Sequence, residues 1–374
     1  MRTFGLSLFC MQACLAMLLL NGNNLQAASI LVRLEQPPPS GTVAFALFDS
    51  ANSFGDLRKP ARLDIQPVDG RDVYQLDGVA PGEYALLVYH DENGNRRMDK
   101  NFIGIPTEPV GFSNGYSPKG PPNYTQAAFR LEEDEQRTFT VDLRRPLGKR
   151  GRLGVGPGLI ARSSPYRDYH GNISKVIPAI AYNGERLQIF GPNFQFGLSG
   201  TGKLRLAAVG RYRIGVYEED DSDYLEGMGD RDDTLMAGLA LQAELPFGFD
   251  FALSYQHDML DNIGGGEARA ALDKSLQVGA FRISPEMGLN WLADDLASHD
   301  FGVPADKARS GRPAYDPEAS FSFEVGLGLM YELTTDWLVI MNVAAEFFSD
   351  EITDSPIVDD DYVLKGFFAI NYVF

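Results

Sequence analysis

The chain has 374 residues and a formal net charge of -18 at pH 7. This excess of carboxylates argues against nucleic acid as a partner, because phosphates would repel the protein. After the N-terminus there is no run of about 20 apolar residues, so helical membrane spans are excluded and only a β-barrel could cross a bilayer.

Residues 1–27 predict a signal peptide. Arg2 precedes an apolar stretch that ends at Leu20, and the small residue Ala28 follows a polar segment, as a cleavage site requires. Cys10 and Cys14 are the two cysteines of the chain, and both lie in this segment. The exported protein is therefore expected to form no disulfide. A lipoprotein anchored at Cys14 is the alternative, although the residues before Cys14 fit that signal less well.

Residues 28–143 predict a soluble β-sandwich of about seven strands, because short β-rich runs recur between turn signals. The runs are "ILVRLEQ", "TVAFALF", "ARLDIQPV", "DVYQLDGV", "EYALLVYH", "QAAFRLEE" and "RTFTVDL". "EYALLVYH" is apolar on both faces, which is typical of a central strand. The stretch "FIGIPTEPVGFSNGYSPKGPPNY" is rich in proline and glycine and predicts a long ordered loop.

The segment "HDENGNRRMDKN" is a candidate calcium site, the only cofactor that the sequence suggests. Asp91, Asn93, Asn95 and Asp99 place oxygen atoms around a turn that Gly94 keeps open, as a hard cation requires. The match to an EF-hand loop is partial. The alternative is a polar hairpin in which these side chains bond their own backbone. The surrounding pattern, "GVAPGEYALLVYHDENGN", resembles an uncharacterised family of exported bacterial β domains, and this resemblance implies no activity.

Residues 144–152, "RRPLGKRGR", form a basic linker in an acidic chain. Pro146 and Gly148 would break any regular element. Two interpretations stay open at this point: a solvated hinge, and a contact with anionic lipid head groups at the inner face of a membrane.

Residues 153–374 predict an antiparallel transmembrane β-barrel. In "SFSFEVGLGLMYEL" alternate residues from Phe321 to Leu333 form one apolar face, opposite small and charged residues, which is typical of strands between lipid and a polar lumen. Long acidic or glycine-rich loops alternate with tight turns at "LPFGF", "VGAFR" and "LTTDW". Because bacterial barrels place short turns in the periplasm, both barrel termini and the sandwich are expected there.

Eleven segments can be counted, whereas termini on the same side require an even number. Splitting "RLQIFGPNFQFGLSG" at Gly191-Pro192 gives twelve strands, which we prefer, and merging neighbours gives ten. If the alternation holds, eight charged side chains face the lumen, where they would form either a salt-bridged plug or a water path. They are Arg205, Arg211, Arg213, Glu244, Glu286, Glu324, Glu332 and Glu346.

The motifs "LEGMGDRDDT", "FGVPADKARSGRPAYDPEA" and "DSPIV", together with the aromatic C-terminus, resemble the MipA/OmpV family of outer-membrane proteins. The resemblance implies the outer membrane of a Gram-negative bacterium. Its best-known members are proposed scaffolds that link a lytic transglycosylase to a murein synthase, and others are described as adhesins or surface antigens. The fused sandwich departs from the simple family pattern.

The last strand carries aromatic and apolar residues at alternate positions: Phe368, Ile370, Tyr372 and Phe374. This pattern resembles the signal by which the barrel assembly machinery receives a barrel. Its apolar face is expected to contact outer-membrane lipid, and the strand must pair with the first one, because an open edge in hydrocarbon leaves backbone groups unbonded.

These patterns predict a non-enzymatic scaffold for envelope or peptidoglycan-remodelling proteins, with peptidoglycan-processing enzymes as candidate partners. A solute channel and a surface adhesin acting through the long loops are the alternatives. His257 and His299 lie near acidic residues, but no spacing marks a nucleophile with its base, so catalysis is not expected.

Overall fold

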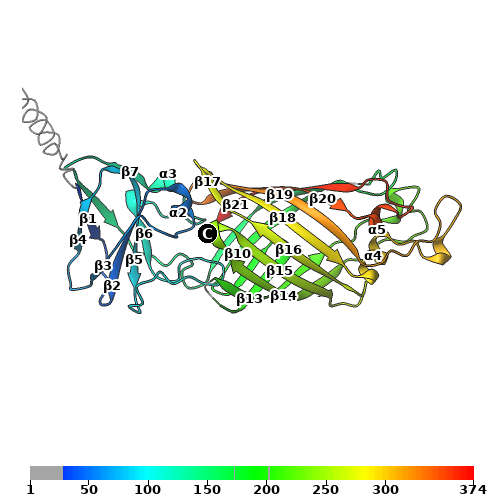
Figure 1. The fold of residues 1–374 in the computed structure, drawn as a ribbon, viewed down its shortest axis with the longest axis horizontal. Coiled ribbons are helices and arrows are strands. Elements are labelled where there is room, and N and C mark those ends of the chain that lie inside the picture. Colours follow the sequence, from blue (N-terminus) through cyan, green and yellow to red (C-terminus); the bar gives the residue numbers. More distant parts are fainter. Residues whose placement is uncertain (1–27, 172, 201–202) are drawn as a thin grey trace, which may run out of the picture.

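The structure is a computed structural model, and it describes residues 28–171, 173–200 and 203–374. A β-sandwich and a β-barrel follow one another along the long axis (Figure 1). No helix among the described residues is long and apolar enough to cross a membrane. The predicted signal peptide, residues 1–27, lies outside the described residues.

The sandwich contains two sheets. Their strands are β1 (Ala28–Leu34), β2 (Thr42–Phe48), β3 (Arg62–Pro67), β4 (Val73–Val79), β5 (Gly82–Asp91), β6 (Val110–Phe112), β7 (Ala128–Leu131) and β8 (Gln136–Val141). One sheet has the order β4-β1-β8, and the other has the order β3-β2-β5-β6, with β7 also paired to β5. All seven predicted strands are present. The eighth, β6, lies in the stretch that was predicted to be a loop.

Strands β2 and β5 are buried on both faces, which confirms the prediction of a central strand. Toward the first sheet, Phe45 and Val88 pack in one apolar core. On the opposite face, Phe48 and Leu87 join a second core that holds Phe54. Short helices cover this second face: α2 (Ala51–Gly55), η1 (Ser113–Gly115) and α3 (Tyr124–Ala127).

The barrel is a closed antiparallel sheet. Its strands are β9 (Arg152–Arg162), β10 (Ser174–Asn183), β11 (Leu187–Phe190), β12 (Asn193–Ser199), β13 (Leu204–Arg213), β14 (Thr234–Glu244), β15 (Asp250–Asp258), β16 (Gly266–Asp273), β17 (Leu276–Val278), β18 (Phe281–Leu292), β19 (Ser320–Glu332), β20 (Trp337–Phe348) and β21 (Tyr362–Val373). β16 and β17 pair in succession with β18 and act as one strand, so the barrel has twelve. The preferred strand number is confirmed.

Two local features of the sequence explain this closure. Gly191 adopts a positive φ of 55°, and with Pro192 it forms the turn between β11 and β12, where Phe190 pairs with Asn193. The last strand, β21, pairs with the first, β9, along its length, as the need to bond every backbone group in lipid requires.

The outer surface of the barrel is apolar. On β19, Phe321, Phe323, Val325 and Leu327 are each at least 40% exposed, and the residues between them face inward. This alternation is typical of a wall between lipid and a polar interior.

The connections differ between the two ends of the barrel. Three short turns lie at the sandwich end, as predicted. They connect β14 to β15, β17 to β18, and β19 to β20, and the first of them contains η3 (Pro246–Gly248). The opposite end carries η2 (Glu219–Asp221), α4 (Asp294–Phe301), η4 (Ala305–Lys307) and α5 (Asp350–Thr353) (Figure 1). There the long loops share an apolar core that includes Tyr166, Tyr217, Leu225 and Phe301.

Candidate functional site: the junction of sandwich and barrel

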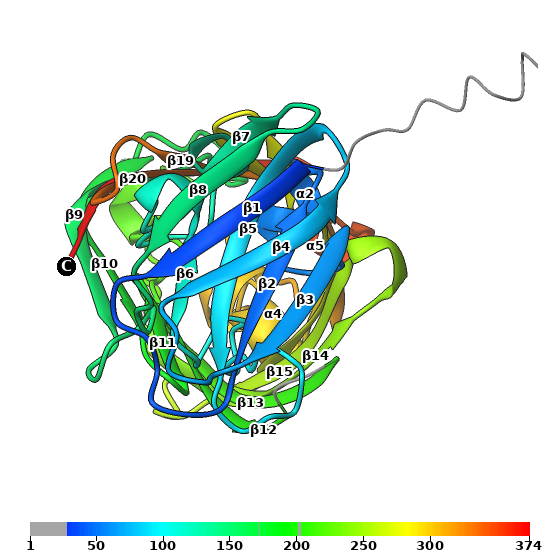
Figure 2. The same ribbon diagram turned by 90° about the vertical axis from the view of Figure 1, so that its left-hand side faces the viewer.

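The sandwich lies across the short-turn end of the barrel (Figure 2). Three of its segments reach the barrel. They are residues 52–58 at the end of α2, residues 100–106 in the loop after β5, and residues 116–121 in the loop before α3.

The segment 100–106 inserts Phe102 into the barrel mouth. This side chain is 3% exposed and lies against Gly197 of β12. Its carbonyl oxygen accepts a hydrogen bond from Nη1 of Arg205 at 3.0 Å, and the side-chain amide of Asn101 donates to the carbonyl of Gly184 at 3.1 Å. Backbone and side-chain contacts thus fix this loop on β12, β13 and the turn between β10 and β11.

The segment 52–58 is held by charged pairs. Arg282 of β18 donates to Asp56 at 2.9 Å and to the carbonyl oxygen of Gly55 at 3.1 Å. Arg58 pairs with Glu244 at the end of β14 at 2.6 Å. Two oppositely directed ion pairs therefore join this segment to separate parts of the barrel rim.

The segment 116–121 contacts the β19–β20 turn and the end of β21. The Tyr116 hydroxyl donates to Glu332 at 2.7 Å, and burial together with this carboxylate raises the pKa of Tyr116. Lys119 pairs with Asp336 at 2.9 Å and donates to the carbonyl oxygen of Val373 at 2.7 Å. The C-terminal strand is therefore in direct contact with the sandwich.

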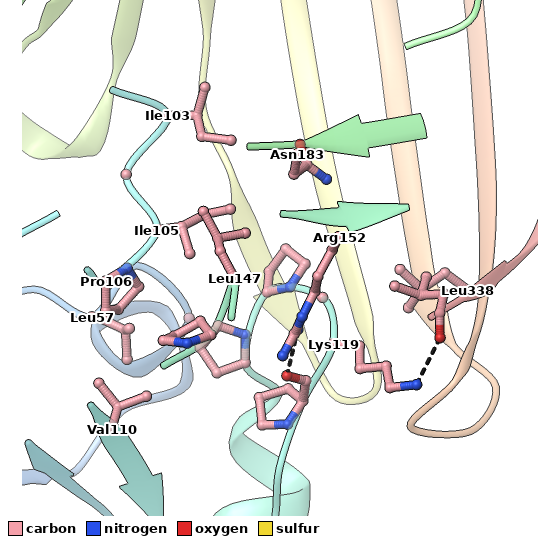
Figure 3. Close-up of a pocket in the computed structure, with 18 of the residues that line it drawn as sticks. Leu57, Ile103, Ile105, Pro106, Val110, Lys119, Leu147, Arg152, Asn183 and Leu338 are labelled. Atoms are coloured by element: carbon pink, nitrogen blue, oxygen red, sulfur yellow. Dashed lines mark hydrogen bonds between the residues drawn. The ribbon is translucent and has the colours of Figure 1, made fainter. Parts of the chain in front are cut away.

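The three segments line a partly open cavity of about 610 Å³ between the sandwich and the barrel. Figure 3 shows that its wall includes apolar side chains from both parts, among them Leu57, Ile105, Leu147 and Leu338. Arg152, at the start of β9, also lines it and donates to the carbonyl oxygen of Pro118 at 2.9 Å (Figure 3). The linker residue Leu147 thus forms part of the wall.

Lys100 brings a further cation to this cavity. Its ammonium group donates to the carbonyl oxygens of Asp56 at 2.9 Å and Leu57 at 3.2 Å. Burial and the neighbouring charge of Arg58 lower the pKa of Lys100 to about 8. The side chain therefore sits close to the point where it loses its charge at mildly alkaline pH.

The eight predicted lumen charges fall into two groups. Arg205, Glu244 and Glu332 lie at the mouth and contact the sandwich, as described above. The other five lie deeper or toward the far loops: Arg211, Arg213, Glu286, Glu324 and Glu346. The predicted set therefore divides between the seat of the sandwich and the interior of the barrel.

The deeper charges form ion pairs between strands. Arg269 pairs with Glu324 at 2.7 Å and also with Glu286. Lys365 of β21 bridges Glu324 at 2.7 Å and Glu346 at 2.6 Å. This network spans β16, β18, β19, β20 and β21, so it ties a large part of the wall together from the inside.

Two more pairs connect distant segments. Arg211 of β13 pairs with Glu267 of β16, although β14 and β15 lie between those strands. Arg213 pairs with Asp300 of helix α4, which belongs to the loops at the far end. Ion pairs therefore connect the interior strands with one another and with the loops at the far end of the barrel.

The sequence-based reasoning missed the partners in these pairs, chiefly Arg269, Lys365 and Glu267. Lys365 could have been found, because it lies in phase with the inward-facing residues of "YVLKGFFAINYVF". Arg269 alternates with alanines in "GEARAALD", a pattern whose apolar face is weak. Arg58, Lys100 and Arg152 carry no such signal, since their position depends on how the two parts meet.

The candidate calcium loop forms a turn closed by its own hydrogen bonds. Asp91 accepts from the backbone nitrogens of Asn95 at 3.1 Å and Arg96 at 2.8 Å. Asp99 accepts from the side-chain amides of Asn93 at 2.7 Å and Asn95 at 3.0 Å. Within the described parts of the chain, no group of three or more His, Cys, Asp or Glu side chains is placed to hold a metal ion. Calcium binding by these four residues stays a prediction.

The aromatic terminus lies on the outer face of β21. Phe368 and Phe374 are exposed, and Tyr372 packs against Trp337 and Phe374, with ring centroids 5.2 and 5.0 Å apart. Ile370 shares this face by alternation. The role of these residues as an assembly signal stays a prediction.

Comparison with known proteins gives two family matches. Residues 153–374 match the family model described as "MltA-interacting protein MipA", and residues 36–139 match one described as "Uncharacterized protein conserved in bacteria". The chain is 30% identical over 234 residues to the "MltA-interacting protein" of Escherichia coli (strain K12), which covers 60% of this chain and 91% of that protein.

The chain is also 28% identical over 184 residues to the "Outer membrane protein OmpV" of Vibrio cholerae, covering 48% of this chain and 70% of that protein. Among solved structures, the NanC porin aligns with a TM-score of 0.31 at 10% identity and covers 59% of this chain and 98% of its own. That structural likeness is too distant to carry a conclusion. The relatives confirm the expected resemblance and the outer-membrane location.

Proposed function

Because the chain belongs to the MipA/OmpV family of outer-membrane proteins, we propose that it is a non-enzymatic scaffold. Its barrel anchors the sandwich at the periplasmic face of the outer membrane, and the sandwich binds an envelope protein there. A peptidoglycan-processing enzyme is the class of partner that we favour, since one relative is named for its interaction with MltA.

The observation that carries this proposal is the seat of the sandwich on the barrel. Three separate segments hold it, through Phe102 in the mouth, the pair of Arg282 with Asp56, and the bond from Tyr116 to Glu332. A domain fixed at several points around a rim presents its outer sheet in a defined orientation. A partner that docks on it is thereby placed at a fixed distance from the membrane.

The sandwich is an addition to the part of the chain that resembles this relative. The alignment with the MltA-interacting protein spans 91% of that protein but only 60% of this chain, and the family model described by that name matches residues 153–374, the barrel. In this chain the sandwich covers the barrel end that carries the short turns. We propose that the sandwich takes over as the docking surface, because it occupies the place where a partner would otherwise meet the barrel.

A solute channel is supported less well. Ion pairs cross the interior, as between Arg211 and Glu267, and the long loops pack over an apolar core at one end. The sandwich lies over the other end. We therefore expect purified protein in planar bilayers to show no steady conductance above that of a bilayer without protein.

Affinity capture from cross-linked envelopes tests the scaffold directly. The full chain is compared with a variant that lacks residues 28–143 but keeps residues 1–27, both at equal abundance in the outer membrane. We expect a peptidoglycan-processing enzyme to be recovered with the full chain and to be depleted at least tenfold with the variant. Equal recovery of the enzyme with both proteins would show that it docks on the barrel. Recovery of assembly factors alone would overturn the scaffold role.

A further inference from the structure

We propose that the cavity between the sandwich and the barrel binds a small amphipathic anion, whose charged group is attracted by the two lining cations that lack a carboxylate partner, Lys100 and Arg152, and whose hydrocarbon part contacts the apolar wall. This site is separate from the outer surface on which a partner protein would dock. It does not depend on the scaffold role.

Cations outnumber carboxylates among the residues that line the cavity. The lining contains three carboxylates, Asp56, Asp142 and Asp250. It contains these cations: Arg58, Lys100, Lys119, Arg144, Arg145, Arg152, Arg205 and Arg282. In a chain with a net charge of -18, such a concentration of cations around one cavity is unexpected from composition alone. It favours an anionic occupant.

Most of these cations already have carboxylate partners. Their pairs are Arg58 with Glu244, Lys119 with Asp336, Arg144 with Asp142, Arg145 with Glu92, Arg205 with Asp250 and Arg282 with Asp56. Among the described residues, Lys100 and Arg152 have no carboxylate within 4.0 Å and donate only to backbone carbonyl oxygens. Two cations that line one cavity are thus left without a counter-charge.

Sheltering a charge from water is costly unless an opposite charge or several hydrogen bonds compensate it. The lowered pKa of Lys100 reports this cost, because burial is its largest cause. A bound anion would supply the missing counter-charge. Arg205 gives a second indication, since its Nε, a hydrogen-bond donor, is buried without a partner.

The rest of the wall calls for an apolar body on the ligand. Leu57, Ile105, Leu147 and Leu338 lie on different sides of the cavity (Figure 3). A volume of about 610 Å³ is within the range of about 300–1,000 Å³ that is usual for small-molecule sites. Inorganic phosphate would leave the apolar wall without a contact, whereas an anion with a hydrocarbon chain would bury part of it.

Isothermal titration of the full chain in detergent tests the proposal, with hexanesulfonate as the probe. This ion keeps one negative charge at every pH used, and hexan-1-ol is its uncharged counterpart. We expect saturable binding of hexanesulfonate, at least tenfold weaker binding of hexan-1-ol, and at least tenfold weaker binding of inorganic phosphate. Equal binding of hexanesulfonate and hexan-1-ol would overturn the proposal, since it would indicate partition into the micelle.

Variants locate the site. K100Q and R152Q should each weaken hexanesulfonate binding about tenfold, which corresponds to about 1.4 kcal/mol. R144Q is the matched control, because Arg144 lines the same cavity but already has Asp142 as its partner, and its affinity should stay within twofold of wild type. Unchanged affinity in both K100Q and R152Q would place the ligand elsewhere and overturn the proposal.

A measurement on the wild type covers the case in which a variant fails to fold. Acetylation of Lys100 by an amine-reactive reagent can be followed by mass spectrometry. It should slow at least fivefold in saturating hexanesulfonate, while Lys149 in the exposed linker is acetylated at an unchanged rate. Equal slowing of both lysines, or of neither, would contradict binding at this site. Comparing the affinities of hexyl phosphate and hexanoate then shows whether the natural ligand carries a phosphate or a carboxylate head group, since the matching ion binds more tightly.

Discussion

The ring of Phe102 lies so close to Gly197 that a Cβ atom at residue 197 would be 2.5 Å from the ring carbon Cγ. One residue belongs to a loop of the sandwich and the other to strand β12 of the barrel. Only glycine leaves room for this aromatic ring in the mouth. The position of the sandwich on the barrel therefore depends on glycine at residue 197.

We expect G197V to loosen the sandwich without unfolding the barrel. Overpacking of a filled site costs about 1–3 kcal/mol, and here the loop can leave the mouth instead of deforming the strand. Hydrogen exchange in residues 100–106 should accelerate by about tenfold or more. G366A serves as the control, because a Cβ at that residue would meet no atom closer than 3.8 Å. An unchanged exchange rate in G197V would show that the ring is not held there.

Lys365 should stabilise the barrel from within. It bridges Glu324 and Glu346, so K365M leaves two acidic groups facing each other without their shared cation. Removing one partner of a fully buried ion pair costs about 3 kcal/mol. Because Lys365 is 35% exposed, we expect a smaller loss, about 1–2 kcal/mol, in the free energy of unfolding in urea.

Adding E346Q to K365M should recover part of that loss, since it removes the charge of Glu346, whereas Glu324 keeps Arg269 as a partner. K149M in the exposed linker should leave the unfolding curve unchanged. A barrel that tolerates K365M as well as K149M would mean that the interior network contributes nothing to stability.

The aromatic terminus predicts an assembly defect. Replacing both Tyr372 and Phe374 by alanine removes the rings that stack along the end of β21 and beside Trp337. We expect the heat-modifiable form in outer-membrane fractions to fall severalfold. V343A, which changes an exposed apolar residue on β20, should assemble normally. Equal amounts of heat-modifiable protein in both variants would exclude these rings as a signal.

Binding of hexanesulfonate should weaken as pH rises through the pKa of Lys100, which is about 8. Below this pH the ammonium is charged and attracts the anion, and above it the free protein must first take up a proton. The groups that set this pKa besides burial are Arg58, Glu244 and Asp56. Affinity at pH 9 should be about tenfold lower than at pH 7, since one pKa unit corresponds to about 1.36 kcal/mol.

K100R should remove this pH dependence, because a guanidinium keeps its charge across the range. Titrations at pH 7 and pH 9 would then give the same affinity for K100R and different affinities for wild type. A wild-type affinity that is constant over this range would exclude Lys100 from the site.

The sequence predicts the elements of this protein better than it predicts their assembly. Strands such as β19 and β21 alternate between lipid and lumen, and this period of two is written directly in the residues. Gly191-Pro192 marks the extra hairpin because its backbone preferences are local. β6 was missed, since it is three residues long and lies in a stretch rich in proline and glycine.

The junction could not be predicted, because its contacts depend on surfaces that meet only after both parts fold. Phe102 reads as an ordinary loop aromatic and Gly197 as an ordinary strand glycine, and nothing local links two residues so far apart in the chain. Lys100 and Arg152 look like solvated surface charges. Glu244 and Glu332 were recognised as inward-facing, but their partners Arg58 and Tyr116 come from the other part of the chain.

An engineered disulfide offers the most direct test that the barrel holds the sandwich on its mouth. A Cβ at Gly120 would lie 3.2 Å from Cδ1 of Leu338, so these two positions are in direct contact and are chosen for the cysteine pair. The described residues contain no cysteine that could compete. The cysteines are first oxidised in intact cells. The chain is then cleaved at a protease site placed in residues 147–151, between the sandwich and the barrel. G70C with L338C is the control pair.

We predict that the G120C, L338C fragments stay joined after cleavage and separate only when reductant is added, whereas the control fragments separate without it. Fragments of G120C, L338C that separate without reductant, from oxidised and correctly assembled protein, would contradict a sandwich seated on the barrel mouth.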